Sequence, residues 1–328
     1  MTGDIRIIDA IEIEAALSRA DAVDAIEQAL RRGQDVEADT PRLFRTLAAG
    51  EFLLMPAESR DHAGVKVATV APRNTDLGLP KIHAWYLVFD AQTLRPAALL
   101  DGTSLTILRT PAVTVAAIRA LLRADPRGPR ERVERLAVIG SGPQADAHVR
   151  TLAAVMPVGR VDIVARNPER GRSLVEALGF DGIDAHLSSR DELARADVII
   201  AATSSSDPVL DLADVDSAAV IAAVGAHGPD ARELGGDLVR AADLVVEARA
   251  SAYREAGNLL LARTAVEWIR EHRVLNLREL ISTGIERRSG APAVYAGVGM
   301  SWEDLAIVER ILQNLASPGD TVDDGSTR

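Results

Sequence analysis

Cysteine is absent from the 328-residue sequence. Its absence excludes disulfide bonds, thiol nucleophiles and thiolate metal sites, and no other residue pattern predicts a bound metal. Aromatic residues make up only 3% of the chain, so the core must be packed mainly by the Ala, Val, Leu and Ile among its 47% of hydrophobic residues.

The sequence also lacks an excess of basic residues and long apolar runs. Asp and Glu outnumber Lys and Arg by 48 to 37, a net charge of −11, so a nucleic acid or an anionic membrane would be repelled at long range. No stretch approaches the roughly 18 to 20 uninterrupted apolar residues of a membrane helix, and the start lacks a basic region followed by an apolar run. We therefore expect a cytoplasmic protein with no nucleic-acid and no membrane partner.

The first 124 residues mix helical and strand periodicities. Apolar residues at helical spacing predict helices over residues 22–30 and 106–122. Four β-rich runs separated by turn-prone segments predict an antiparallel or mixed sheet, with strands at residues 52–55, 65–70, 82–89 and 97–100. The segment Asp125-Pro126-Arg127-Gly128-Pro129-Arg130 is the clearest domain boundary.

Beyond that boundary strands and helices alternate. Strands are predicted at residues 133–139, 160–164, 185–187, 197–202, 218–224 and 244–247, and helical segments at 144–155, 168–178 and 191–195. This alternation predicts an α/β domain with a doubly wound parallel sheet. Ser301-Trp302-Glu303-Asp304 matches a capping box before a helix over 305–315, and the polar residues from Ser317 onward are expected to be disordered.

A glycine turn joins the first strand of this domain to its first helix. It contains Gly140, Ser141, Gly142, Pro143 and Gln144. The first glycine permits a tight turn, and the second lets the backbone approach a pyrophosphate at the helix N-terminus. Because the turn stands in a βαβ context, we predict a dinucleotide site.

The end of the next strand indicates which dinucleotide is bound. An acidic residue there would accept a hydrogen bond from the 2′-hydroxyl of NAD, but the chain has Arg166, which can pair with a 2′-phosphate. We therefore expect NADP(H), with NAD(H) possible. Asn167 before Pro168 fits a helix N-cap. The further residues assigned to the cofactor site are Asn167, Thr203, Val224, Gly225, Gly299 and Met300.

Three cations in the first domain suit a small carboxylate substrate. Arg42, Lys66 and Arg109 provide guanidinium groups to clamp a carboxylate and an ammonium group placed for proton transfer. Alternatively, Lys66 is the outward residue of an edge strand and Arg109 an exposed helix residue. His83 alternates with Lys81 and Trp85 on one strand face, which either lines the substrate pocket or forms an oligomer contact.

Motifs from both domains carry a family resemblance. They are Gly64-Val65-Lys66, Gly78-Leu79-Pro80, Leu108-Arg109-Thr110, Ile139-Gly140-Ser141-Gly142-Pro143-Gln144, Ala223-Val224-Gly225, Arg232-Glu233-Leu234, Gly297-Val298-Gly299-Met300 and Glu303-Asp304. In this order they resemble the ornithine cyclodeaminase/mu-crystallin family, whose members include cyclodeaminases, alanine dehydrogenases, ketimine reductases and a crystallin that binds thyroid hormone.

The resemblance implies an architecture and a substrate site. It implies a substrate-binding and dimerisation domain of α+β type, built from residues 1–124 and the returning C-terminal segment 300–328, and a Rossmann domain over 125–299. It also implies that Arg42, Lys66 and Arg109 hold a substrate carboxylate and that the protein is a homodimer through the first-domain sheet.

One departure from the family pattern concerns the chemistry. Where cyclodeaminases have an aspartate after the Ala-Val-Gly strand, this chain has His227, with Asp230 three residues later. An imidazole can protonate a nascent amine, whereas it cannot supply a fixed negative charge for a substrate ammonium group. Lys66, His227 and Asp230 are therefore the catalytic candidates, although His227 can equally be a structural loop residue.

We expect an NAD(P)-dependent oxidoreductase acting on C=N or CH–NH groups. The preferred function is NADPH-dependent reduction of a cyclic ketimine carboxylate of the pyrroline-2-carboxylate or piperideine-2-carboxylate type. The alternatives are an NAD-dependent cyclodeaminase or amino-acid dehydrogenase, and a crystallin-like NADPH-binding protein with little turnover.

Overall fold

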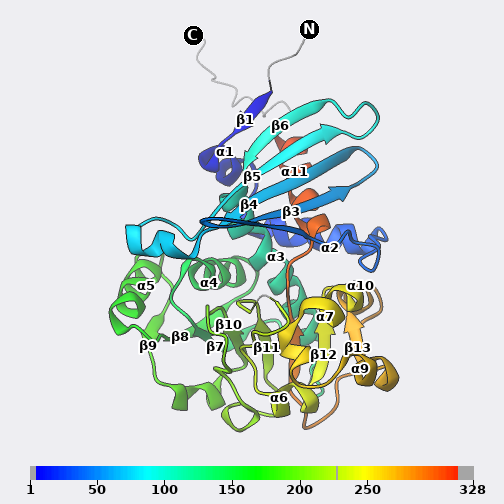
Figure 1. Ribbon diagram of the computed structural model, residues 1–328. Helices are drawn as coiled ribbons and strands as arrows, with labels where there is room; N and C mark the ends of the chain where they lie inside the picture. Colours follow the sequence, from blue (N-terminus) through cyan, green and yellow to red (C-terminus); the bar gives the residue numbers. More distant parts are fainter. Residues whose placement is uncertain (1–4, 227, 317–328) are drawn as a thin grey trace, which may run out of the picture.

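Two sheets with helices between them make up the fold. The computed structural model describes residues 5–226 and 228–316, so His227 and the polar C-terminal segment predicted to be disordered lie outside the described residues. The smaller sheet and the larger sheet lie at opposite ends of the molecule in Figure 1, separated by a layer of helices.

The first sheet has six strands in the order β1-β6-β5-β4-β3-β2. The strands are β1 (Arg6–Ile8), β2 (Leu43–Leu47), β3 (Gly50–Glu58), β4 (His62–Val70), β5 (Ile82–Asp90) and β6 (Pro96–Asp101). All neighbours are antiparallel except β1 and β6. The mixed sheet predicted from the sequence is therefore present, with longer strands and with the short β1 and β2 added at its edges.

Side chains of this sheet alternate between two faces. In β4 the buried positions include Lys66 and Ala68, and in β5 they include Ala84 and Tyr86. These residues point toward the helical layer, because residues two apart in a strand share a face. Trp85 is 46% exposed, so the opposite face of the sheet is open.

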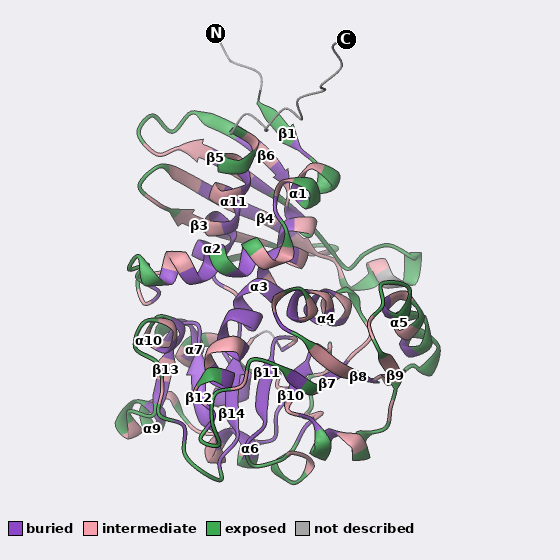
Figure 2. Cartoon of the chain, turned by 180° about the vertical axis from the view of Figure 1, so that it is seen from behind, coloured by how far each residue is buried: buried purple, intermediate pink, exposed green. Residues whose placement is uncertain are grey.

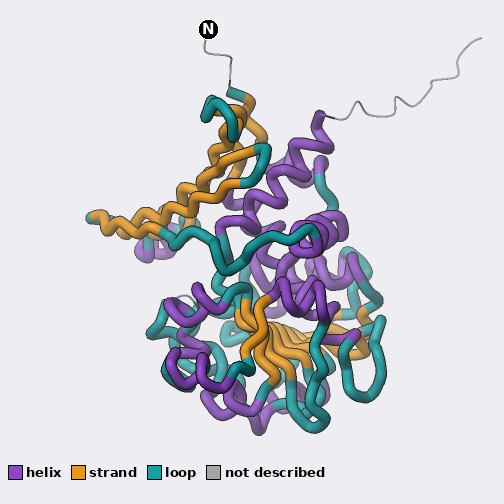
Figure 3. Tube along the Cα trace, turned by 90° about the vertical axis from the view of Figure 1, so that its right-hand side faces the viewer, coloured by secondary structure: helices purple, strands orange, loops and turns teal. Residues whose placement is uncertain are grey.

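The helical layer joins the two sheets. It contains α1 (Ala10–Ala16), α2 (Arg19–Arg31), α3 (Gly102–Arg123) and α11 (Ser301–Ala316), with the 3₁₀ turn η1 (Pro72–Leu77) outside it. α11 returns from the far end of the chain to pack on β3, β4, α2 and α3. Figure 3 shows the first sheet beside these helices. The domain division at residues 124 and 300 remains a prediction.

Helix α3 is the central helix of the molecule. Its length and hydropathy would allow it to cross a membrane, but 72% of the qualifying window is buried inside the structure. It packs on α2, α4, β5 and the second sheet, as a core helix does. Figure 2 shows buried residues gathered in α3 and in the strands below it.

The second sheet has eight parallel strands in the order β13-β12-β14-β11-β10-β7-β8-β9. They are β7 (Val133–Ile139), β8 (Val158–Val164), β9 (Ala185–Leu187), β10 (Val198–Ala201), β11 (Val220–Ala223), β12 (Asp243–Val246), β13 (Val274–Asn276) and β14 (Ala293–Ala296). The chain runs from β7 to one side and later returns to the other side with β10, so β7 ends at a topological switch point.

Helices and short turns connect these strands. They are α4 (Pro143–Val155), α5 (Pro168–Phe180), η2 (Arg190–Arg195), η3 (Leu212–Asp214), α6 (Gly236–Ala241), α7 (Arg249–Glu255), α8 (Gly257–Leu260), α9 (Ala265–Glu271) and α10 (Leu277–Thr283). The predicted doubly wound α/β fold is confirmed. β13, β14 and the helices between residues 236 and 283, each three to seven residues long, were not predicted.

The predicted capping box at Ser301 is wrong. α11 already begins at Ser301, whose Oγ has no hydrogen-bond partner in the described chain. The Glu303 carboxylate instead accepts from the backbone N–H of Met300, at 3.0 Å. The Asp39 carboxylate accepts from the N–H groups of Ser301 and Trp302 at 3.2 and 3.3 Å, so the first domain caps this helix across more than 260 residues of sequence.

Candidate functional site

The glycine turn after β7 is shaped to receive a ligand. Gly140 has φ +130°, and a Cβ there would lie 2.5 Å from the carbonyl oxygen of Ala202. A Cβ on Gly142, the N-cap of the 13-residue helix α4, would meet no protein atom within 4 Å. Packing within the chain therefore does not explain Gly142, whereas a ligand at the helix N-terminus does.

Two further residues belong to this turn. The buried Oε1 of Gln144 has no hydrogen-bond partner in the described part of the chain, and as an acceptor it needs a donor group rather than a phosphate oxygen. Ala145 is fully buried where the helix packs on the sheet, as the sequence pattern requires. The backbone of the turn, with Ser141 and Pro143 on either side of Gly142, fits the pyrophosphate of a dinucleotide.

Arg166 stands at the carboxyl end of β8, next to this turn in the parallel sheet. It is exposed, and its side chain makes no hydrogen bond or ion pair with any residue that the structure describes. The Asn167 side chain accepts from the N–H groups of Glu169 and Arg170 at 3.0 and 3.1 Å. The predicted N-cap is thus present, while contacts of Arg166 and Asn167 with a cofactor remain predictions.

A buried carboxylate joins the next two strand ends. Glu233 accepts hydrogen bonds from the N–H and hydroxyl of Thr203, both at 2.7 Å, and from the N–H of Gly225 at 2.7 Å. Burial raises the pKa of Glu233. The donors of Thr203 and Gly225 are therefore engaged within the protein, and Val224 between these loops is buried. Any cofactor contact of Thr203, Val224 or Gly225 must therefore use atoms other than these engaged N–H and hydroxyl groups.

A second buried carboxylate holds the loop after β14. Glu247 accepts from the hydroxyl of Tyr295 at 3.1 Å and from the N–H groups of Val298 and Gly299, each at 2.8 Å. Gly299 has φ +77°, and a Cβ there would lie 2.6 Å from Nη1 of Arg109. This glycine turn therefore brings the backbone against the guanidinium group of Arg109, and Met300 is buried beside it.

Lys66 and Arg109 share one carboxylate in the interior. Lys66 Nζ lies 2.7 Å from Asp304 Oδ2, and Arg109 Nε lies 3.1 Å from Asp304 Oδ1. Arg109 Nη1 also contacts Glu303 Oε2 at 2.5 Å. All four side chains are at least 90% buried, so the alternative readings of an outward lysine and an exposed arginine are wrong.

The two cations respond oppositely to this environment. Burial, reinforced by the positive charge of Arg109, lowers the pKa of Lys66 to about 8 even though Asp304 opposes the change. For Arg109, burial is outweighed by Asp304 and Glu303, which raise its pKa above the usual value. Burial and then Glu247 raise the pKa of Glu303 well above its ordinary value. Lys66 is thus protonated near neutral pH, and its ammonium group is acidic enough to release a proton.

Arg42 approaches the same place from the segment before β2. It donates to the carbonyl oxygens of Val298 and Gly299, the latter at 2.6 Å, and its Nε lies 3.5 Å from Glu255 Oε2. Because Gly299 also lies against Arg109, the structure brings together the three predicted cations Arg42, Lys66 and Arg109. Glu247, Glu255, Glu303 and Asp304 were not predicted as their partners, although Glu303-Asp304 was among the family motifs.

The remaining predicted residues lie apart or outside the described chain. His83 is exposed on β5, where its neighbours Ala84 and Tyr86 face inward, so His83 lies on the opposite sheet face from Lys66. This geometry disfavours substrate contact within one chain and fits the oligomer alternative. Asp230 is exposed, and its side chain has no ion pair with the described residues. His227 lies outside the described residues.

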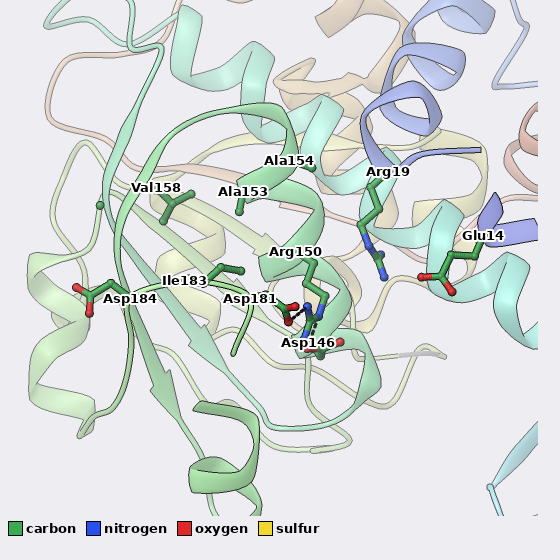
Figure 4. A pocket seen from close by; sticks show the side chains of 12 residues that line it. Glu14, Arg19, Asp146, Arg150, Ala153, Ala154, Val158, Asp181, Ile183 and Asp184 are labelled. Atoms are coloured by element: carbon green, nitrogen blue, oxygen red, sulfur yellow. Dashed lines mark hydrogen bonds and ion pairs between the residues drawn. The ribbon is translucent and has the colours of Figure 1, made fainter. Parts of the chain in front are cut away.

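A separate hollow of about 910 Å³ lies on another part of the molecule (Figure 4). It is lined by Glu14 and Arg19 near α2, by residues of α4 including Arg150, and by segments before β8 and β9. Arg150 pairs there with Asp146 and Asp181. Because the hollow lies at the amino ends of these strands, it is not the dinucleotide site, which parallel sheets form at their carboxyl ends.

The sheet order and the glycine turn together define a Rossmann dinucleotide-binding protein, which also contains a buried cluster of three cations. The sequence profile of the ornithine cyclodeaminase/mu-crystallin family matches residues 4–319. The chain therefore belongs to this family, as its motifs predicted.

Relatives and solved structures agree with this membership. The chain is 34% identical to the Delta(1)-pyrroline-2-carboxylate/Delta(1)-piperideine-2-carboxylate reductase of Azospirillum brasilense, over 95% of this chain and 97% of that protein. It is 33% identical to Delta(1)-pyrroline-2-carboxylate reductase 2 of Burkholderia ambifaria, over 89% and 94%. The Thermococcus litoralis Delta(1)-pyrroline-2-carboxylate reductase in complex with NADH and L-proline superposes with a TM-score of 0.82, at 25% identity over 94% and 97%.

An archaeal alanine dehydrogenase dimer with bound NAD is similarly close, with a TM-score of 0.82 at 26% identity over 94% of this chain and 95% of that one. These relatives are reductases and dehydrogenases of imino or amino acids. The predicted assignment as an NAD(P)-dependent oxidoreductase acting on C=N or CH–NH groups is confirmed.

Proposed function

We propose that the protein is a cytoplasmic, NADPH-dependent reductase of cyclic ketimine carboxylates of the pyrroline-2-carboxylate or piperideine-2-carboxylate type. The observation that carries the proposal is the placement of Arg42 and Arg109 against Gly299, on the loop that follows a strand of the dinucleotide-binding sheet. Lys66 joins them because it shares Asp304 with Arg109. Two of the relatives bear the names of such reductases.

The substrate carboxylate binds to the three cations in this proposal. Glu303 and Asp304 hold Arg109 and Lys66 in place before the substrate arrives, so little reorganisation is needed. When bound, NADPH supplies the hydride for the C=N carbon. The ring nitrogen takes one proton, from Lys66, from His227 or from a water molecule. Addition of one hydride and one proton converts the imine to the amine.

NADPH is preferred over NADH because Arg166 offers an unpaired guanidinium where the ribose lies. We expect Arg166→Ala to raise the KM for NADPH about tenfold, the loss of one charge-assisted hydrogen bond, and to leave the KM for NADH nearly unchanged. Arg172→Ala is the matched control, since Arg172 is an exposed arginine within α5. A wild-type protein that uses both cofactors equally would contradict the preference.

The direct test follows NADPH absorbance with each cyclic ketimine. Oxidation of NADPH with at least one of them is expected, and no oxidation with any would refute the proposal. Release of ammonia from ornithine with catalytic NAD⁺ would support a cyclodeaminase instead. Tight NADPH binding without turnover on a broad panel of imines and amino acids would support a crystallin-like binding protein.

The protein is further proposed to be a homodimer through the open face of the first sheet. Leu43, Phe52 and Trp85 on that sheet are 57%, 37% and 46% exposed. Large apolar side chains gathered on one face are typical of an interface. Sedimentation should show a dimer that Trp85→Lys weakens, whereas Phe180→Lys, at an exposed apolar residue ending α5, should leave it unchanged. A wild-type monomer would contradict this interface.

A further inference from the structure

A buried histidine connects the helix of the substrate site with the helix of the dinucleotide turn. His148 lies in α4 and is fully buried. Its Nδ1 is 2.6 Å from the backbone carbonyl oxygen of Gln144, and its Nε2 is 3.1 Å from Oγ1 of Thr114 in α3. Thr114 is itself 1% exposed, so water does not compete for either contact.

The two contacts define the form of the imidazole. A carbonyl oxygen only accepts, so the proton must be on Nδ1, which donates to Gln144. Burial lowers the pKa of His148 to about 4, so the ring is neutral near pH 7 and Nε2 accepts from the Thr114 hydroxyl. That hydroxyl has a single proton, so when it donates to Nε2 it only approaches the carbonyl oxygen of Thr110, at 2.9 Å.

A hydrogen-bonded bridge therefore joins the two halves of the proposed active site. It runs from Gln144, in the dinucleotide turn, through His148 to Thr114, which follows Arg109 by five residues in α3. Neither His148 nor Thr114 takes part in the proposed catalytic steps. Hydride transfer depends steeply on alignment, and a displacement of about 1 Å can reduce a rate by roughly 100-fold.

We propose that His148 is a positioning residue whose Nε2 bond to Thr114 fixes the first turn of α4 against α3, and with it the spacing between the dinucleotide turn and Arg109. The proposal rests on the proposed reductase function for its effect on rate. The bridge itself is a property of the fold and is testable without turnover.

Two pairs of variants isolate the bond between the helices. The terminal atoms of glutamine are as many bonds from Cβ as His Nε2, so His148→Gln keeps an acceptor for Thr114. Asparagine reaches only as far as Nδ1, so His148→Asn keeps the contact with Gln144 and loses the bridge. Thr114→Val removes the bridge from the other side. Thr151→Val is the control for Thr114→Val. Thr151 is a buried threonine in α4, the helix of His148, and it contacts Arg19 instead.

We expect His148→Asn and Thr114→Val to lower kcat about tenfold while the Kd for NADPH, measured by fluorescence without substrate, changes less than about twofold. His148→Gln should recover most of this loss, and Thr151→Val should show none. A general structural defect would not produce this split between kcat and Kd, nor the rescue by glutamine.

Amide hydrogen exchange of Asp146, whose N–H donates to the carbonyl oxygen of Gly142 at 3.2 Å and so closes the first turn of α4, supplies the readout that needs no turnover. Protection should fall several-fold in His148→Asn and Thr114→Val and remain in His148→Gln and Thr151→Val. If the wild type reduces no ketimine, the proposed function fails while this exchange pattern still decides the bridge. Equal protection in Thr114→Val and Thr151→Val, or equal loss in the glutamine and asparagine variants, would overturn the inference.

Discussion

Lys66 and Arg109 share Asp304, yet the fold treats their charges in opposite ways. It disfavours the ammonium of Lys66, whose pKa is lowered to about 8, and favours the guanidinium of Arg109, whose pKa is raised. We therefore predict different stability effects for Lys66→Met and Arg109→Met, although each removes one cation from the same buried cluster.

The magnitude for Lys66 comes from its pKa. A decrease from 10.5 to about 8, at about 1.4 kcal/mol per pH unit, means that the charged form of Lys66 costs about 3 kcal/mol in the folded protein. Because this pKa already includes the attraction of Asp304, Lys66→Met removes a net cost, and Asp304 keeps Arg109 at 3.1 Å. The free energy of unfolding at pH 7 should therefore not fall, and it should rise by up to about 3 kcal/mol.

Arg109→Met has no such compensation. It leaves the buried Oε2 of Glu303 without its 2.5 Å partner and Asp304 without one of its two cations. Removal of one member of a buried ion pair costs about 3 to 5 kcal/mol. We expect the free energy of unfolding to fall by that amount.

The pH dependence gives an independent check on Lys66. Between pH 8 and 10.5 the unfolded chain retains a proton on Lys66 that the folded chain has released. Stability therefore rises with pH where the unfolded state binds more protons, so the wild type should gain up to about 3 kcal/mol relative to Lys66→Met across this window.

Urea unfolding of the three proteins at pH 7, 8, 9 and 10 would measure both effects. The slope of the free energy against urea must stay constant, so that the same unfolding transition is compared. A loss in Lys66→Met at pH 7 as large as that in Arg109→Met would refute the charge argument, as would a wild-type curve parallel to Lys66→Met up to pH 10.

Three further predictions concern the loops around this cluster. Gly142→Ala should weaken NADPH binding in a fluorescence titration and change the free energy of unfolding by less than about 0.5 kcal/mol. Gly225→Ala should instead be strongly destabilised, because its Cβ would lie 2.0 Å from the Thr203 carbonyl oxygen. Equal losses of stability in the two variants would contradict this prediction. Burial raises the pKa of Asp39 from 3.8 to about 6, so the folded protein binds the proton more readily and thermal stability should gain from Asp39 as pH falls from 6 to 4, a gain that Asp39→Asn should lack. Glu233→Ala should cost about 2 to 4 kcal/mol in urea unfolding because it leaves buried N–H donors unpaired, and Glu233→Gln should cost less.

The sequence predicted features that depend on local spacing. Residues 136–139 at the end of β7 and 198–201 in β10 are continuous apolar runs because helices cover both faces, and the glycine turn at Gly140 follows the first of them. Both could be predicted because the residues responsible are adjacent in the chain. Length alone does not explain why β14, with four residues, was missed, because the equally short β10, β11 and β12 were predicted.

The partners of the site residues could not be predicted from local patterns. Lys66 meets Asp304 and Arg109 meets Glu303 from positions about two hundred residues away. Period-two alternation separates His83 from its neighbours on β5, but only α11 and α3 packed on one face determine which side is buried. The capping of α11 by Asp39 has the same origin, since an acidic side chain more than 260 residues away in the sequence takes the place of the local Ser301.

The charge of the site follows from this internal pairing. Arg42, Lys66 and Arg109 are each bound by carboxylates or carbonyl oxygens of the chain, so an anionic substrate meets cations whose positions are already determined. Four carboxylates contact or adjoin these three cations, and burial and then Glu247 raise the pKa of Glu303. A substrate carboxylate therefore adds to a nearly balanced cluster rather than to an excess of positive charge. Affinity in such a cluster depends on the geometry of the donors, so a net charge of −11 does not oppose the anion site that we propose.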